Sequence, residues 1–410
     1  MLKKESKILV NKEEIKDLLE RGVSEIYPTK EKLEKLLLSG KKLKIYAGAD
    51  ATGPSIHLGH TKIFIMLEKL RKMGHEVIVL FGDFTAKIGD PTDKSAARVR
   101  LTNQEVKNNL KNWKKQISPI INLKDKKNPA KISFNSKWLS KLNFDDVVDL
   151  ASNFTVQQMI ERDMFQKRIK DGKPIFLHEF FYPIMQGYDS VCLDVDLEIG
   201  GTDQTFNMLT GRTLMSKLKN KEKFVLTVGL IEDPKTGKKL MSKSEGDAIW
   251  LDDSPDEMFG KVMSLQDEAI IPMLISTTLV ETKRIEEIEK DLKNGINPKE
   301  AKIFLAKEIV KMYHGEKESE KSFNNFEKAF SKKTGLPENT PIIKIKKSTR
   351  LVDLLIENKF IKSKSEFNRL IIAGAIKDLK NGEKISDKDL KIESDIDLKI
   401  GKKVFVKIIL

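Results

Sequence analysis

The sequence has very little cysteine and no long apolar run. Cys192 is the single cysteine among 410 residues, which excludes a disulfide within the chain and a zinc site built from several cysteines. No apolar run approaches the ~20 residues that a membrane-spanning helix needs, and the N-terminus is too polar for a secretory signal. We therefore expect a cytoplasmic protein with no protein-bound metal and no membrane partner.

Acidic residues are outnumbered by basic ones. The chain has 75 lysines and arginines against 61 aspartates and glutamates, for a formal net charge of +14. This excess favours a polyanionic partner, nucleic acid first, although a solvated, lysine-rich surface without such a partner accounts for it equally well. With 39% hydrophobic and 33% charged residues, the chain is typical of a soluble protein, and its length suits two or three domains.

A strand–loop–helix–strand pattern begins near residue 45. The apolar run at 45–48 predicts a short buried strand. A loop with glycine and proline follows, and the next residues predict a helix from about 55 to 73. A continuous apolar run at 77–81 predicts a second strand. This is a βαβ unit, which implies a parallel sheet.

Two later runs complete an expected α/β domain. Apolar and polar residues alternate over 191–199, which predicts a strand that two glycines end, and 224–231 predicts another. The residues at about 102–180 have a mostly helical pattern and indicate an insertion between the two halves. We therefore expect a Rossmann-type parallel-sheet domain over 1–250, with a helical insertion.

The pattern changes after the last of these strands. Residues 251–335 predict amphipathic helices, and 332–347, rich in lysine with two prolines and a glycine, is typical of a linker. Residues 348–410 predict a compact, basic domain of helices and short strands. The expected fold is thus an α/β domain, an all-helical domain and a small α+β domain.

His57-Leu58-Gly59-His60 stands where the helix of the βαβ unit is expected to begin. A helix N-terminus has unpaired N–H groups and a partial positive charge, and both attract phosphate. Two imidazoles three residues apart share one face and can stabilise charge on a phosphate. Gly59 leaves room for a nucleotide against the backbone. The alternative is two ordinary histidines on a partly exposed face; the position of the pair, which holds two of only five histidines, favours phosphate binding.

Met241-Ser242-Lys243-Ser244 follows the last expected strand, in a loop at about 235–247 that glycines bracket. Lys243 can meet triphosphate oxygens as a compact cation; the alternative is a solvated basic turn. The string Leu-Met-Ser-Lys occurs twice, at 214–217 and 240–243. The first copy lies in a helical apolar pattern, so only the second has the context of a mobile loop.

Together the two motifs resemble the class I aminoacyl-tRNA synthetases, which have a histidine motif early and a KMSKS loop late. The segments YAGADATGPSIHLGH, GDFTAKIGDPTDKS, FLHEFFYPIMQGYDS and EIGGTDQTFN narrow the resemblance to the tyrosyl-tRNA synthetase family, in the same order and over nearly the whole chain. The resemblance implies ATP-dependent activation of L-tyrosine and transfer of the tyrosyl group to tRNA(Tyr). It also implies Mg²⁺ bound with ATP and a homodimer, with the insertion as the interface.

The resemblance also implies roles for individual residues. Those matched to the tyrosine pocket are Tyr46, Asp90, Tyr182, Gln186, Asp189 and Gln204, with Tyr46 and Asp189 at the phenol. Those matched to ATP binding are Asp50, Thr52, Gly59, Lys94, Arg98, Asp203, Met241 and Lys243, and those matched to catalysis are His57, His60 and Lys243. Their chemistry agrees, since a buried phenol needs an acceptor and an ammonium needs an anion.

Ordinary structural explanations remain for these residues taken singly. Tyr46 suits a strand face, Asp50 and Asp90 suit turns, and Asp203 suits a helix cap. The sequence also departs from the family at Leu240, which stands where the KMSKS loop usually begins with lysine. Lys238 or Lys239, just before it, can supply the missing charge.

The last domain, at 348–410, resembles S4-type RNA-binding domains. Ser363 and Glu366 predict a capping box for a helix that carries the expected RNA-binding residues Lys364, Asn368 and Arg369, because basic residues at a helix start meet phosphates. The resemblance makes 251–335 an anticodon-contacting domain. Rival readings are a tryptophanyl enzyme, a non-catalytic RNA-binding relative, and another nucleotidyl transferase with the same histidine motif.

Overall fold

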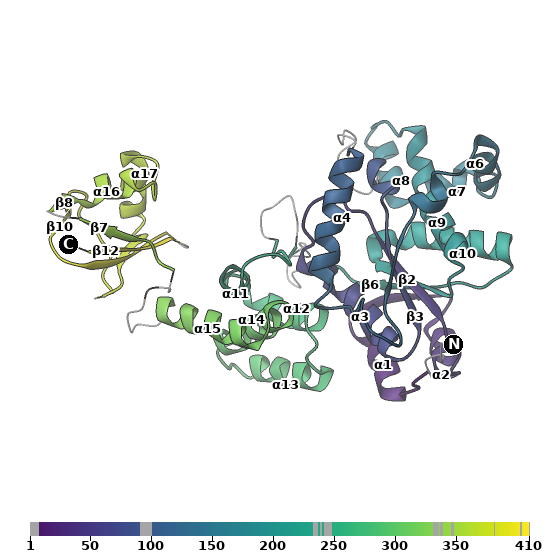
Figure 1. The fold of residues 1–410 in the computed structure, drawn as a ribbon, viewed down its shortest axis with the longest axis horizontal. Helices are drawn as coiled ribbons and strands as arrows, with labels where there is room; N and C mark the ends of the chain where they lie inside the picture. Colours follow the sequence, from purple (N-terminus) through teal and green to yellow (C-terminus); the bar gives the residue numbers. More distant parts are fainter. Residues whose placement is uncertain are drawn as a thin grey trace. The chain divides into compact units, whose positions relative to one another are not determined.

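The chain divides into two compact units. The computed structural model describes residues 8–90, 101–232, 237, 240–241, 248–330, 336, 339–345, 348–380, 382–401 and 404–409. The first unit joins Met1–Asp253 with Ser264–Tyr313, and the second joins Ser254–Met263 with His314–Leu410. Each unit is described by itself (Figure 1).

The first unit is built on one sheet, with the strand order β1-β6-β5-β2-β3-β4. Its strands are β1 (Val23–Tyr27), β2 (Lys44–Ala49), β3 (Glu76–Phe81), β4 (Lys131–Phe134), β5 (Leu197–Gly201) and β6 (Phe224–Val228). Only β1 runs antiparallel to its neighbour, and the other neighbouring strands pair parallel. The parallel α/β architecture expected from the sequence is confirmed.

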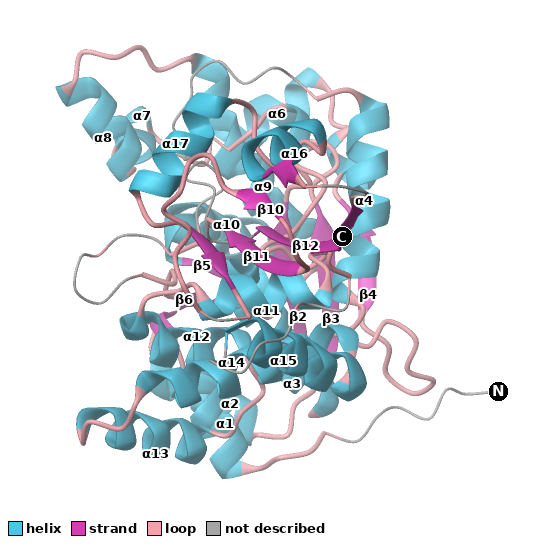
Figure 2. Ribbon diagram, turned by 90° about the vertical axis from the view of Figure 1, so that its left-hand side faces the viewer, coloured by secondary structure: helices cyan, strands magenta, loops and turns pink. Residues whose placement is uncertain are grey.

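Helices surround this sheet (Figure 2). They are α1 (Lys12–Glu20), α2 (Lys30–Leu38), α3 (Thr61–Lys72), α4 (Asn103–Ile117), α5 (Ser136–Leu139), α6 (Phe144–Ala151), α7 (Val156–Ile160), α8 (Asp163–Lys170), α9 (Phe181–Leu193), α10 (Thr205–Lys219), α12 (Ile270–Thr277), α13 (Thr282–Lys293) and α14 (Pro298–His314). Short 3₁₀ turns are η1 (Leu58–His60), η2 (Thr85–Lys87), η3 (Leu177–Phe180), η4 (Thr202–Gln204) and η5 (Asp267–Ala269). Helix α3 packs on β2, β3 and β5, and α10 packs on β5 and β6.

The strand order places a topological switch point between β2 and β5. The chain goes from β2 to β3 on one side, and β5 and β6 lie on the other. In open parallel sheets, ligands bind at such a point, beyond the carboxyl ends of the strands. The loops that follow β2, β3, β4 and β5 therefore meet at the expected site.

Three sequence-based boundaries are corrected by the structure. The helix expected from about residue 55 begins at Thr61, because 56–58 pairs with 249–251 in extended conformation: the Leu58 N–H donates to the Ile249 carbonyl at 2.9 Å and the Leu251 N–H to the Ile56 carbonyl at 2.8 Å. The Ser55 hydroxyl, before this extended segment, donates to Asp252 at 2.7 Å.

The strand expected over 191–199 is wrong in its first half. Helix α9 extends to Leu193, and Asp194 ends it in the left-handed region at φ 51°. Val191 is buried against α10 residues Leu214 and Met215, so its apolar character reflects helix packing. Only the end of the alternating run enters β5.

The expected insertion and domain limits also differ. Strand β4, inside 102–180, pairs with β3, so this stretch also supplies one strand of the sheet, between helices α4 and α5. Helices α12 to α14 belong to the first unit, because the Arg21 guanidinium donates to the carbonyls of Leu274 and Thr278 at 2.9 and 3.0 Å, and the Tyr313 and Thr61 hydroxyls share a 2.9 Å hydrogen bond. Residues 251–335 are therefore not one separate body.

The second unit contains the helices α11 and α15 and a small α+β fold. Helix α11 (Pro255–Met263) packs on α15 (Glu316–Phe330). The other elements are β7 (Ile342–Lys344), β8 (Thr349–Arg350), α16 (Leu351–Glu357), α17 (Lys364–Ile372), β9 (Ile376–Asp378), β10 (Lys391–Ile392), β11 (Ile396–Ile400) and β12 (Val404–Ile409). A sheet of order β7-β12-β11-β9 and the helices α16 and α17 enclose a common apolar core, as expected for 348–410.

Candidate active site

The loop after β2 carries Asp50, which two neighbouring elements hold in place. The Tyr182 hydroxyl donates to Asp50 Oδ2 at 2.8 Å, and the Thr85 hydroxyl donates to Oδ1 at 2.7 Å. Gly82, after β3, allows this approach, because a Cβ there would lie 1.8 Å from Asp50 Oδ1. Asp50 is thereby fixed at the carboxyl end of the sheet, at the switch point.

The expected phenol end is buried beneath α9. Tyr46, in β2, is fully buried, and Asp189, in α9, is almost so. Asp189 accepts a 2.7 Å hydrogen bond from Trp138 Nε1 and a 3.3 Å bond from the Asn135 amide, whereas the Tyr46 hydroxyl bonds to the Ser190 hydroxyl at 2.8 Å. Two oxygen groups suited to recognise a hydroxyl are therefore buried here.

Asp90 and Gln204 meet across the switch point. The Gln204 amide donates to Asp90 Oδ2 at 2.7 Å, and Arg162 Nη2 contacts Oδ1 at 2.8 Å. Both partners orient the carboxylate, and the Arg162 guanidinium forms a charge-assisted hydrogen bond with it. An anion held this way suits an ammonium group.

Helix α9 presents Tyr182 and Gln186 one turn apart, on the same face as Asp189. Gln186 accepts from the Asn207 amide at 2.9 Å and donates to Glu198 at 3.3 Å, while Asn207 also donates to Gln204 at 2.9 Å. Hydrogen bonds link four of the expected tyrosine-pocket residues in one series, Tyr46, Gln186, Gln204 and Asp90. Through Asp50, Thr85 and Asn135 they link the other two, Tyr182 and Asp189. We call these six residues, with Asp50 and the side chains that link or hydrogen-bond to them, the polar cluster.

Burial sets the electrostatics of the polar cluster. Loss of solvent raises the pKa of the Asp189 carboxyl well above its usual range, despite the hydrogen bonds from Trp138 and Asn135, which lower it. Burial also raises the pKa of the Tyr46 and Tyr182 phenols well above normal, and nearby carboxylates add to this. Both tyrosines consequently stay protonated at any physiological pH.

The two histidines lie together at the start of α3. Their ring centroids are 4.1 Å apart, and the edge of Trp250 lies near His57, with 5.8 Å between those centroids. His57 is 9% exposed and its Nδ1 accepts from the Gly59 N–H at 3.2 Å. That bond leaves Nε2 as the nitrogen that carries the donor proton in the neutral ring.

The start of the late loop approaches the same motif. Met241 is buried, and a Cβ at Gly59 would lie 3.3 Å from the Met241 Cβ. The Leu240 N–H donates to the Ile231 carbonyl at 2.8 Å, which ties the loop to the end of the sheet. Lys243, and the expected pyrophosphate contacts Lys94 and Arg98, lie outside the described residues.

The remaining expected residues are at the rim. Thr52 is half-buried and its N–H donates to the Asp50 carbonyl at 2.8 Å, and Asp203 is exposed beside Gln204.

In the second unit, Lys364, Asn368 and Arg369 are all exposed on α17. Ser363 caps this helix as expected, but Glu366 accepts from the Lys362 N–H, one residue earlier than a capping box requires.

Sequence reasoning missed part of the polar cluster. Its further members are Thr85, Asn135, Trp138, Arg162, Ser190, Glu198, Asn207 and Lys223. Asn135 and Trp138 follow β4, which the sequence pattern had assigned to a helical insertion. A glutamate in the middle of a buried parallel strand, as at Glu198, was the one signal that could have been noticed.

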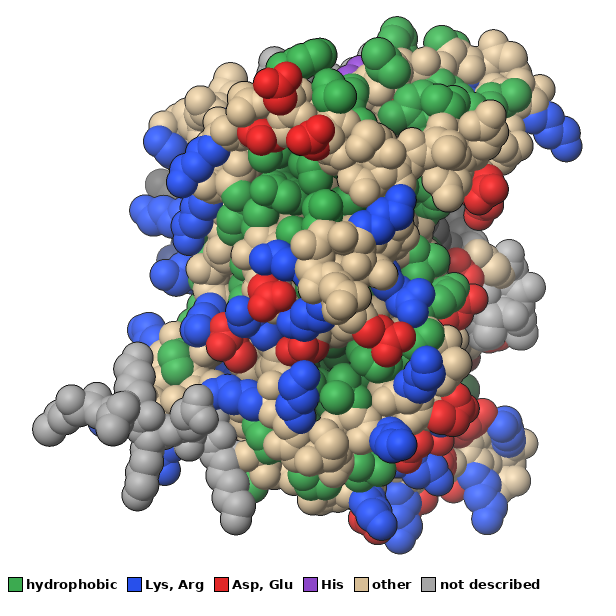
Figure 3. Space-filling view, turned by 90° about the vertical axis from the view of Figure 1, so that its right-hand side faces the viewer, with side chains coloured by type: hydrophobic (Ala, Val, Ile, Leu, Met, Phe, Trp, Pro, Cys, Tyr) green, Lys and Arg blue, Asp and Glu red, His purple; other side chains and the backbone are tan. Residues whose placement is uncertain are grey.

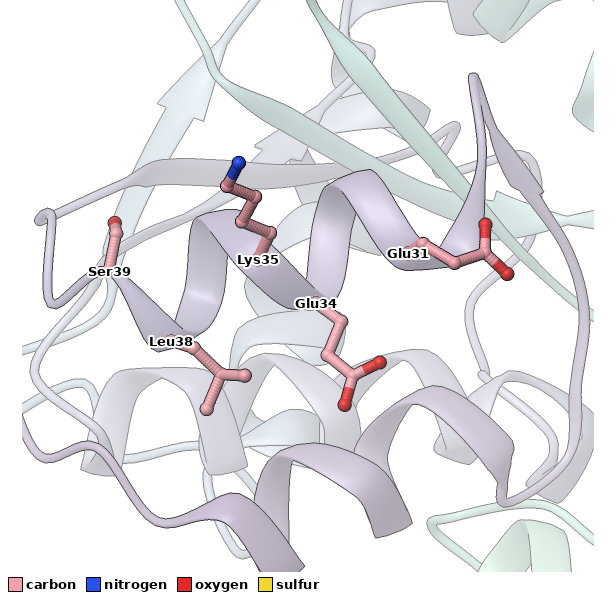
Figure 4. Close-up of a pocket in the computed structure, with 5 residues that line it drawn as sticks. All are labelled: Glu31, Glu34, Lys35, Leu38 and Ser39. Carbon is pink, nitrogen blue, oxygen red and sulfur yellow. The ribbon is translucent and has the colours of Figure 1, made fainter.

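A shallow hollow elsewhere on the surface is not part of this cluster. It is lined by residues of α2 and the turn after it, namely Glu31, Glu34, Lys35, Leu38 and Ser39 (Figure 4). These side chains come from a single helix and hold no hydrogen-bonded constellation like that around Asp50.

Known proteins match this chain along most of its length. Residues 38–331 match the family of class I tRNA synthetases (W and Y). The tyrosine–tRNA ligase of Carboxydothermus hydrogenoformans is 43% identical, over 96% of this chain and 97% of its own, and that of Thermotoga maritima is 40% identical, over 97% of each. A C-terminally truncated mitochondrial tyrosyl-tRNA synthetase from Coccidioides posadasii is 26% identical, with a TM-score of 0.62 over 76% of this chain and 91% of that one.

A parallel sheet with a histidine motif at its switch point and these matches define a class I aminoacyl-tRNA synthetase. Within that class, the chain belongs to the tyrosyl-tRNA synthetase family. The resemblance carried by the sequence motifs is confirmed.

Proposed function

We propose that this chain activates L-tyrosine with ATP to tyrosyl-adenylate and transfers the tyrosyl group to tRNA(Tyr). The observation that supports it most is the polar cluster, in which Tyr46 and Asp189 lie at one end and Asp90 at the other. A buried hydroxyl-binding end and an anionic end fit the phenol and the ammonium of one amino acid. A hydrophobic amino acid would leave the buried polar groups unpaired, which is costly.

In this proposal the polar cluster positions tyrosine. Asp189 and Tyr46 bind the phenol, while Asp90, Tyr182 and Gln186 bind the ammonium. Gln204, whose amide already contacts Asp90 at 2.7 Å, lies at the carboxylate. The substrate carboxylate can then attack the α-phosphorus of ATP without a protein nucleophile, since positioning carries much of the rate enhancement.

The histidine motif and the late loop bind the phosphates of ATP. His57 and His60 stabilise charge on the transferring phosphate, and Lys243, Lys94 and Arg98 stabilise the leaving pyrophosphate. Asp50, Thr52, Gly59 and Met241 border the nucleotide, and Asp203 binds its ribose. Mg²⁺ enters with ATP, held by the phosphate oxygens and water.

We further propose that the second unit grips the tRNA. Lys364, Asn368 and Arg369 are exposed on α17 and meet RNA phosphates there, consistent with a net charge of +14. Helices over 251–335 contact the anticodon region. The reaction takes place in the cytoplasm, where a tagged chain would be found by fractionation.

The exposed surface of the insertion is suited to form the interface of a homodimer. Large apolar side chains stand exposed there, among them Phe144 at 80% and Leu177 at 74%, and Figure 3 shows hydrophobic side chains gathered on this face of the chain. Exposed apolar patches of this kind mark interfaces. Light scattering should give twice the monomer mass, and Leu177→Asp should shift it toward the monomer.

Amino-acid-dependent ATP–pyrophosphate exchange tests the activity. Run with each of the twenty amino acids, it should give exchange with tyrosine and background with the rest, tryptophan included. Exchange with another amino acid but not tyrosine would overturn the proposal. Charging of tRNA(Tyr) transcript, compared with a second tRNA, then tests the transfer step.

A further inference from the structure

A buried ion pair stands directly behind the proposed tyrosine pocket. Glu198, in β5, is 2% exposed, and Lys223, just before β6, is completely buried. The Lys223 ammonium contacts Glu198 Oε2 and donates to the Met208 carbonyl at 3.0 Å. Nothing in the reaction itself calls for this pair, and burying two charges costs free energy that a well-packed apolar pair avoids.

The sheet register puts Glu198 beside Tyr46. The two residues are partners across the parallel pairing of β2 and β5, so their side chains leave the same face of the sheet. The Lys223 ammonium lies 5.9 Å from the Tyr46 ring centroid. The pair is therefore within reach of the phenol end.

Each oxygen of Glu198 reaches a different end of the pocket. Oε2 accepts from the Ser190 hydroxyl at 3.4 Å, and that hydroxyl bonds to Tyr46 at 2.8 Å. Oε1 accepts from the Gln186 amide at 3.3 Å. One carboxylate thus contacts the partner of the phenol-binding tyrosine and a residue of the ammonium-binding group.

The bonding through Ser190 has a defined direction. The Ser190 hydroxyl is the donor in its 3.4 Å bond to Glu198 Oε2, and a hydroxyl has only one proton to donate. Ser190 therefore donates to Glu198 and accepts from Tyr46. With its proton committed, Tyr46 offers the pocket only lone pairs, so a hydroxyl bound there must donate.

We propose that the Glu198–Lys223 pair is a positioning element that orients Tyr46, through Ser190, at the phenol end and Gln186 at the ammonium end. The Lys223 ammonium pairs with Glu198 Oε2, and Gly211 makes room for that ammonium, because a Cβ there would lie 2.6 Å from it. This inference rests on the proposed function and adds a specificity determinant to it.

Two ligands test the phenol end and the ammonium end of the proposed pocket separately. 3-(4-Hydroxyphenyl)propionate keeps the phenol and lacks the ammonium, and L-phenylalanine has the reverse. Their dissociation constants, measured by titration calorimetry, should both rise about tenfold in Glu198→Gln/Lys223→Met, since a charge-assisted hydrogen bond is lost at each end. Ser190→Ala should weaken only the hydroxyphenylpropionate.

A matched control removes a different buried ion pair. Glu68 and Arg71, in α3, bond at 2.7 and 2.8 Å and are 8% and 5% exposed. Glu68→Gln/Arg71→Met should lower the melting temperature and leave both dissociation constants unchanged. Circular dichroism confirms that each variant is folded.

The outcomes separate cleanly. Unchanged binding of both ligands in the Glu198/Lys223 variant, or weaker binding of only one, would overturn the two-ended role. Because the readout is binding, it stands apart from catalysis: an unsubstituted protein without tyrosine-dependent exchange would count against the proposed function alone.

Discussion

The hydroxyl of Tyr182 donates a 2.8 Å hydrogen bond to Asp50 across 132 residues of sequence. The bond joins a helix of the second half of the domain to the loop after the first strand of the βαβ unit. It holds Asp50 at the carboxyl end of the sheet, together with the Thr85 hydroxyl. Several consequences of this arrangement can be measured.

Replacing Asp189 with alanine should raise the KM for tyrosine at least tenfold, with little change in the KM for ATP. The substitution leaves a substrate phenol and the Trp138 indole N–H without their acceptor, a loss of roughly 1–3 kcal/mol. Tyrosine-dependent pyrophosphate exchange measures both constants. Unchanged tyrosine activation would remove Asp189 from the pocket.

Asp90→Asn should weaken tyrosine binding about tenfold or more, because the substituent can no longer pair its charge with an ammonium. Binding of 3-(4-hydroxyphenyl)propionate, which has no ammonium, should change little. Titration calorimetry with the two ligands makes the comparison. Equal weakening of the binding of both ligands would mean that Asp90 maintains the structure of the site and does not pair with the ammonium.

Gly82→Ala should severely impair activity, since the new Cβ would lie 1.8 Å from Asp50 Oδ1 and displace that carboxylate. Gly229→Ala is the matched control, because a Cβ there meets nothing within 4 Å. We expect kcat/KM for the exchange reaction to fall at least tenfold in the first variant and to stay near normal in the second. Similar rates in both would show that Asp50 can move freely.

His60→Ala and His57→Ala should lower kcat by about 10²–10³ with a nearly unchanged KM for tyrosine, as expected when a donor to developing charge is lost. The neighbouring rings, 4.1 Å apart at their centroids, should act on the same phosphate. Single-turnover formation of the adenylate is the direct measurement. A change in tyrosine KM alone would argue for a packing role.

Stability should fall as the pH drops from about 6.5 to about 4, in part because of His75. This imidazole is 1% exposed and accepts from the Leu43 N–H at 3.2 Å, and burial lowers its pKa to about 4. In this window the unfolded chain binds a proton that the folded chain does not, so stability rises with pH and is lost on acidification.

The shift corresponds to roughly 3 kcal/mol at 1.36 kcal/mol per pKa unit. Urea unfolding at pH 7 and pH 4.5 measures it, and His75→Gln, which keeps an acceptor for Leu43 without titrating, should lessen the difference. The same pH dependence in both proteins would assign the effect to other groups.

The sequence by itself determined the class of the fold and the family, and it predicted the residues of the site. Continuous apolar runs at 45–48 and 77–81, separated by a loop and a helical pattern, predicted the buried strands β2 and β3. The histidine motif and the late loop are short local sequences that are informative because of their order along the chain. The residues expected in the tyrosine pocket were identified by their match to a family pattern, and all six lie in the polar cluster.

Tertiary structure decided what depends on contacts between distant segments. Helix α3 begins later than the sequence predicts because 56–58 pairs with 249–251. The alternating run around Val191 is helical because Val191 packs on α10. Strand β4 belongs to the sheet and not to the insertion because it pairs with β3. The Glu198–Lys223 pair depends on strand register in the same way. Local sequence patterns determine which face of a helix or strand is apolar. Which distant segment packs on that face is decided only by the tertiary contacts of the folded chain.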